Sequence, residues 1–117
     1  LEKNNLKYEI LTVPGVYEIP QMIKWKIKPN NYNLFIALGC VIKGKTPHFD
    51  FISKSTFDAI LNLSITYNKP IGNGIITAFN IKQAKERCGL GRSNKTNKGF
   101  EAARAVMSIL NNGPKKI

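Results

Sequence analysis

The chain has 117 residues, 43% of them hydrophobic, which suits one domain with a modest core and argues against a disordered tail. Its formal net charge of +11 favours an anionic partner, such as a phosphorylated metabolite, a nucleic acid or an acidic surface. No apolar run approaches the roughly 20 residues of a membrane helix, and the polar first residues are unlike a signal peptide. The two widely separated cysteines predict a cytoplasmic location.

The first half of the chain reads as strand, helix and strand. Residues 6–13, LKYEILTV, are rich in β-branched and aromatic residues, which predicts a strand. Residues 18–27 place apolar side chains at helical spacing. Residues 34–42, LFIALGCVI, are apolar almost throughout, which predicts a strand covered on both faces, as in a parallel sheet.

The second half reads as helix, strand and two helices. Thr46 can cap a helix that runs through residue 67. Residues 70–77, PIGNGIIT, read as another buried strand, in which two glycines allow close backbone approach. Asn80 can cap a short helix, and residues 98–111 form a last amphipathic helix.

This alternation predicts a parallel α/β sheet with helices on both faces. Three strands are few for such a sheet, so the domain is expected to be incomplete at its N-terminus or to complete its surface by assembly. No repeat or linker divides the sequence, which predicts a single domain over residues 1–117.

The segment GCVIKGKT, residues 39–46, matches the G-x-x-x-x-G-K-T pattern of nucleotide-binding phosphate loops. In such a loop the four residues after the first glycine turn around the phosphates. Here they are CVIK, three of them apolar, and they favour continuation of the strand. The pattern therefore argues against ATP or GTP. It still favours an anion, because Gly44, Lys45 and Thr46 lie between a strand end and a helix start.

The chain has one histidine, His48, in the first turn of the helix that follows this segment. A histidine at the ligand-binding edge of a parallel sheet can exchange protons near neutral pH. The alternative is a surface histidine with no chemical role. The two cysteines, Cys40 and Cys88, fit no metal or redox spacing, and Cys40 is expected in the core.

Three segments resemble lumazine synthases: VPGVYEIP at 13–20, ALGCVIKGKTPHFDFI at 37–52 and NKGFEAA at 97–103. The resemblance covers essentially the whole chain. It implies a three-layer α/β/α sandwich with a parallel, flavodoxin-like sheet. It also implies condensation of 5-amino-6-(D-ribitylamino)uracil with 3,4-dihydroxy-2-butanone 4-phosphate, the penultimate step of riboflavin biosynthesis, without a metal or cofactor.

The resemblance also implies roles for individual residues. His48 matches the proton-transfer histidine of the family. The phosphate-binding positions are Gly44, Lys45, Thr46 and, from a neighbouring subunit, Arg87. The positions that bind the ribityl chain and pyrimidine are Val16, Tyr17, Glu18, Cys40, Val41, Ile42, Asn73 and Lys98. For Glu18 the alternative is a helix cap, and for Arg87 and Lys98 it is an ordinary surface charge.

The sequence departs from the family in three places. The family's N-terminal strand and helix are expected to be absent from this chain. Asn73 stands where many members carry a stacking phenylalanine. The loop between Arg87 and Lys98 is longer than in capsid-forming relatives, which predicts a homopentamer, with a face-to-face decamer as the alternative.

Two other functions compete with the synthase. One is a non-catalytic homologue that binds a flavin or lumazine. The other is a basic nucleic-acid-binding domain, which would need exposed aromatic residues among the basic ones. The lysines are scattered instead, and Phe49, Phe51 and Phe57 are expected on a buried helix.

Overall fold

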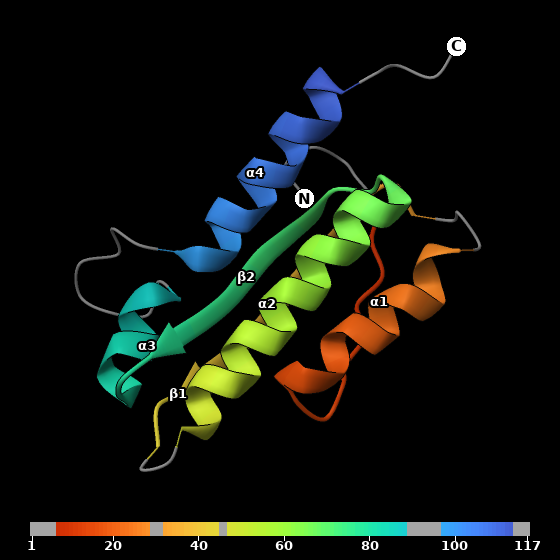
Figure 1. The fold of residues 1–117 in the computed structure, drawn as a ribbon. Helices are drawn as coiled ribbons and strands as arrows, with labels where there is room; N and C mark the ends of the chain where they lie inside the picture. The colour runs from red at the N-terminus through yellow and green to blue at the C-terminus, as the bar shows by residue number, and fades with distance from the viewer. Residues whose placement is uncertain (1–6, 29–31, 45–46, 89–96, 114–117) are drawn as a thin grey trace.

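The computed structural model describes residues 7–28, 32–44, 47–88 and 97–113. Helices cover both faces of a small sheet, which gives the three layers that the sequence predicts (Figure 1). The elements are the 3-10 helix η2 (Val16–Glu18), α1 (Ile19–Ile27), β1 (Phe35–Ile42), α2 (His48–Tyr67), β2 (Ile71–Ala78), α3 (Ile81–Arg87) and α4 (Lys98–Asn112).

The sheet consists of β1 and β2, which pair in parallel from Phe35 opposite Ile71 to Ile42 opposite Ala78. Helix α2 is the crossover between them. Because side chains alternate along a strand, the sheet has two distinct faces. We call the side with Ala37 and Ile75 the inner face, and the opposite side the outer face.

Helices α1 and α2 cover the inner face and form the main core there. In α1 the buried isoleucines repeat every four residues, so they lie on one side of the helix. The buried members of this core are Ile19, Ile23, Ile27, Ala37, Ile60 and Ile75. In Figure 1, α1 and α2 lie on the same side of the sheet.

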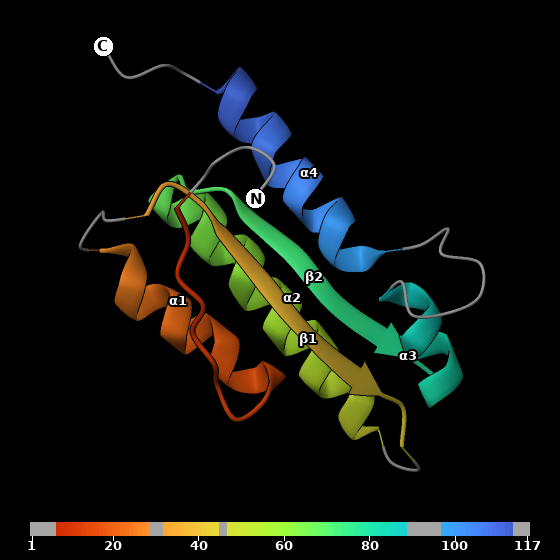
Figure 2. The ribbon, with the colours of Figure 1, turned by 180° about the vertical axis from the view of Figure 1, so that it is seen from behind.

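Helix α4 covers β2 on the outer face, where Gly72 lets it approach closely, while Gly74 makes room for the neighbouring strand β1. A Cβ atom at Gly72 would lie 2.7 Å from the backbone oxygen of Ala102 in α4. One at Gly74 would lie 2.7 Å from Cδ2 of Leu38. The predicted role of these glycines is thus confirmed. Figure 2 shows α4 beside β2, with β1 as the farther strand.

The prediction of a strand over residues 6–13 is wrong for residues 7–13, the part of this segment that the structure describes. Residues 7–13 have no regular secondary structure, and most of them are exposed. The described sheet therefore has two strands where the sequence predicted three. The physical reason is that β-propensity alone does not make a strand, because its backbone groups need a paired neighbour.

Three predictions of burial are also wrong. The strand over residues 34–42 forms, but its outer side is not covered: Leu38 is 62% and Ile42 42% exposed. Cys40 lies on this side and is exposed, so it is not a core residue. On α2, Phe51 is 67% exposed because it points away from the sheet.

One of the two predicted helix caps is confirmed. The Asn80 side chain accepts a hydrogen bond of 2.8 Å from the backbone N–H of Gln83 and caps α3 as predicted. Thr46, the predicted cap of α2, lies outside the described residues. No helix in the described part of the chain is long and apolar enough to cross a membrane.

Candidate active site

The C-terminal ends of β1 and β2 lie side by side and continue pairing past the last strand residue. The backbone N–H of Lys43 donates a 2.8 Å hydrogen bond to the carbonyl of Ala78. Residues 40–43 are therefore extended, as the sequence predicted, and do not wrap around a phosphate. This geometry confirms the argument against a nucleotide-binding loop.

Gly44 and His48 lie just beyond this edge of the sheet. A Cβ atom at Gly44 would meet nothing within 4 Å, so the backbone there is open to a ligand. His48 is the first residue of α2, and its side chain is exposed. Pro47 at the N-cap makes no side-chain capping bond, and helix starts of this kind attract anions. Lys45 and Thr46 lie outside the described residues.

An aromatic residue that sequence reasoning missed, Phe79, adjoins this position. Its ring lies 6.4 Å from that of Phe49, centroid to centroid, and the Nζ of Lys43 lies 5.2 Å from its centroid. Phe79 is 61% exposed, so a planar ligand can reach it. The available signal was its position directly after a buried strand, where ligands of parallel sheets bind.

Helix η2 packs against the middle of β1 on the inner face. A Cβ atom at Gly39 would lie 2.7 Å from Cγ2 of Val16, so the glycine makes room for this turn. Tyr17 is 59% exposed. Glu18 occupies the N-cap position of α1, yet its side chain makes no capping hydrogen bond. A purely structural role as a cap is therefore not supported, and the carboxylate is available for another partner.

Arg87 and Lys98 belong to the helices of the outer face. Arg87 is the last residue of α3, and its Nη1 donates a hydrogen bond to the carbonyl of Thr77 in β2. Lys98 is the first residue of α4 and is half-buried. Most of the loop that joins them, residues 89–96, lies outside the described residues, so the argument from its length stays a prediction.

Not every predicted residue lies at the strand ends. Asn73 is in the middle of β2 on the inner face, and its Oδ1 accepts a 3.0 Å hydrogen bond from the N–H of Ile75. Within one chain this side chain is thus occupied locally, away from His48. Val41 is half-buried on the inner face, whereas Ile42 and Cys40 are exposed on the outer face.

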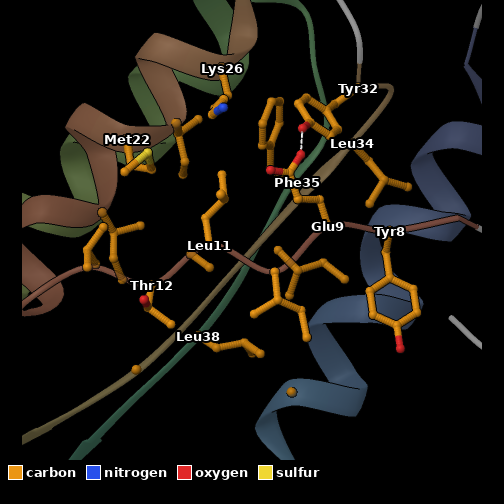
Figure 3. Close-up of a pocket in the computed structure, with 18 of the residues that line it drawn as sticks. Tyr8, Glu9, Leu11, Thr12, Met22, Lys26, Tyr32, Leu34, Phe35 and Leu38 are labelled. Carbon is orange, nitrogen blue, oxygen red and sulfur yellow. Dashed lines mark hydrogen bonds between the residues drawn. The ribbon is translucent and has the colours of Figure 1, made fainter.

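A groove of about 1060 Å³ lies between residues 7–13 and β1. Its lining is mostly apolar, as Figure 3 shows for Leu11, Leu34 and Leu38. Tyr32 donates a hydrogen bond to Glu9 at one end of it. His48 is not among its lining residues, so this groove and the proton-transfer candidate do not coincide.

The fold and the strand ends define a class. A parallel sheet with an open glycine and a helix start at its carboxyl edge is typical of α/β proteins that bind small anionic ligands. Within the described residues, no three histidine, cysteine or acidic side chains cluster as metal ligands would.

Comparison with known proteins identifies the family. The family model for 6,7-dimethyl-8-ribityllumazine synthase matches residues 1–113. A 6,7-dimethyl-8-ribityllumazine synthase of Campylobacter jejuni subsp. doylei is 40% identical over 110 residues, which are 94% of this chain and 68% of the relative. The chain belongs to the 6,7-dimethyl-8-ribityllumazine synthase family.

Two further relatives carry the same name. The protein of Campylobacter curvus is 40% identical over 102 residues, covering 87% of this chain and 64% of the relative. That of Bartonella bacilliformis is 39% identical over 111 residues, covering 93% of this chain and 73% of the relative. The chain thus spans about two thirds of the length of the Campylobacter proteins.

Proposed function

We propose that the protein is a lumazine synthase. It condenses 5-amino-6-(D-ribitylamino)uracil with 3,4-dihydroxy-2-butanone 4-phosphate to 6,7-dimethyl-8-ribityllumazine, phosphate and water, with no metal or cofactor. Membership of the family supports this activity, as does identity of 40% to a relative of that name. The observation that carries the proposal is the position of His48 at the start of α2, directly beyond the paired ends of β1 and β2.

In this proposal the phosphate end of the butanone lies at the start of α2. Gly44 leaves room there, and the helix dipole favours negative charge. Lys45 and Thr46 complete the loop, and Arg87 of a neighbouring subunit adds a fixed cation. Such preorganised donors stabilise the charge that develops as phosphate leaves.

His48 then carries protons during imine formation, phosphate loss and ring closure. Its imidazole is exposed at the edge of the site, where it can act as a general acid and base. Holding the two substrates side by side supplies much of the remaining acceleration.

The ribityl chain and pyrimidine ring lie along the η2 turn and the end of β1. Glu18, which makes no capping bond, accepts hydrogen bonds from ribityl hydroxyls. In place of a stacking phenylalanine, Asn73 offers polar groups. The remaining positions of this part of the site are Val16, Tyr17, Cys40, Val41, Ile42 and Lys98.

The protein acts in the cytoplasm as a homo-oligomer, and each subunit is a single domain over residues 1–117. The preferred assembly is a pentamer, and the alternative is a face-to-face decamer. Exposed apolar side chains on α2 support assembly: Phe51 is 67%, Leu61 61% and Ile65 71% exposed. They lie on the side of the helix opposite to its buried Thr56 and Ile60, so α2 has apolar surface on both sides. Native mass spectrometry of the full-length protein gives the subunit count, and a monomer would contradict assembly.

A condensation assay tests the activity. The full-length protein is mixed with both substrates, and the absorbance of the lumazine is followed. The synthase proposal predicts enzyme-dependent product formation. The second candidate, a non-catalytic flavin- or lumazine-binding homologue, predicts saturable riboflavin binding without turnover, and that result would reject the synthase.

A further inference from the structure

The fold brings together two cysteines that lie far apart in the sequence. Cys40 projects from β1 on the outer face, and Cys88 follows α3 directly. Both residues line one pocket of about 480 Å³, together with Ile76 of β2 and Ala84 of α3. Its lining includes Cys40 of the proposed ribityl and pyrimidine site, but neither η2 nor His48.

Both thiols are at least partly accessible to a small oxidant. Both are free cysteines; Cys40 is exposed and Cys88 half-buried. The Cys88 thiol donates only a weak 3.3 Å hydrogen bond to the carbonyl of Lys85. Although Cys40 is exposed as a residue, desolvation of its thiol raises the pKa, and the nearby Cys88 raises it further, so the Cys40 thiolate forms less readily than that of an isolated cysteine.

We propose that Cys40 and Cys88 form a redox-active pair that closes to an intramolecular disulfide when the protein meets hydrogen peroxide. One thiolate attacks a peroxide oxygen, which gives a sulfenic acid as the O–O bond breaks and water leaves. The second thiolate attacks that sulfur, so an S–S bond forms, the S–O bond breaks and a second water leaves. The two thiols lose two electrons in total, and the peroxide gains them.

The bridge would join the middle of the sheet to the end of α3. Cys88 forms a β-bridge with Asn97, next to the start of α4, and Arg87 precedes it. Oxidation would thus fix the segment that carries Arg87. It would also change the side chain of Cys40. The pair is inferred independently of the synthase activity, and its test does not use that activity.

Peptide mapping tests the pair. The reduced full-length protein is treated with increasing hydrogen peroxide, alkylated and digested without reductant. We expect the Cys40 and Cys88 peptides to be joined within one subunit, with both free thiols lost together and restored by dithiothreitol. A subunit band that stays at monomer mass on a non-reducing denaturing gel shows that the bridge is intramolecular.

The variant Cys88→Ser is the matched control. In it, Cys40 should stop at the sulfenic acid and react with dimedone, whereas in the wild type closure should outcompete dimedone. Phenylarsine oxide, which bridges two neighbouring thiols, should be retained by the wild type and lost from Cys88→Ser. Independent oxidation of each cysteine, or bridges only between subunits, in protein with an unchanged circular dichroism spectrum would overturn the proposal.

Discussion

The two strands of the sheet are both apolar, yet they are buried very differently. In β2, Ile75 is 2% exposed on the inner face and Ala78 2% on the outer face, where α4 and α3 pack. In β1, Ala37 is 3% exposed on the inner face, but Leu38 on the outer face is 62% exposed. An apolar strand therefore indicates a need for packing partners on both faces. It does not show that the described part of the chain supplies both of them.

Truncating one side chain from each strand should give the largest contrast. Ile75→Ala removes a fully buried side chain and should lower the free energy of unfolding by about 4 kcal/mol. Leu38→Ala removes a mostly exposed one and should cost less than about 1 kcal/mol. Urea unfolding of dilute protein measures both. Equal losses would contradict the comparison and mean that the outer side of β1 is covered in solution.

A glycine substitution probes the cover of β2. Gly72→Ala puts a methyl group 2.7 Å from the Ala102 carbonyl oxygen, so α4 must move, and we expect a loss of about 2 kcal/mol. Gly44→Ala meets no atom within 4 Å and is the control, with stability near that of the wild type. Thermal unfolding compares them, and a silent Gly72→Ala would argue against close packing of α4 on β2.

The smallest expected change is a gain in the free energy of unfolding. Thr56 of α2 is 2% exposed, and its Oγ1 has no hydrogen-bond partner among the described residues. Thr56→Val replaces this hydroxyl with a methyl group and should stabilise the inner face by about 1 kcal/mol. Ser55→Ala, on the exposed side of the same helix, should change stability little. Destabilisation by Thr56→Val would indicate that the hydroxyl is paired in solution.

Much of the fold was predictable because its signals are local. The apolar runs near residues 34–42 and 70–77 became β1 and β2, and Asn80 caps α3. The failures concern relations between distant segments. Residues 7–13 have strand-like composition, but a strand depends on a paired neighbour that composition does not reveal. Leu38 has the character of a core residue, yet it is exposed because no described segment covers it.

In the candidate site, too, local features were predictable from the sequence and contacts between distant segments were not. The sequence predicted that Gly44 and His48 follow a strand end, and the structure has them there. It did not reveal Phe79 beside Phe49, because that contact joins the start of α2 to the residue that follows β2. Nor did it bring Cys88 near Cys40, since their proximity depends on how α3 packs across the outer face.

The most direct test of the central claim is the turnover of a His48→Ala variant. If His48 transfers protons at the strand ends, lumazine formation should slow by about a hundredfold or more, while the unfolding midpoint stays near that of the wild type. Asp50→Asn, an exposed change one residue beyond Phe49 on α2, is the control and should keep wild-type turnover. Unchanged turnover per folded His48→Ala molecule would contradict the assignment and leave His48 as a surface residue.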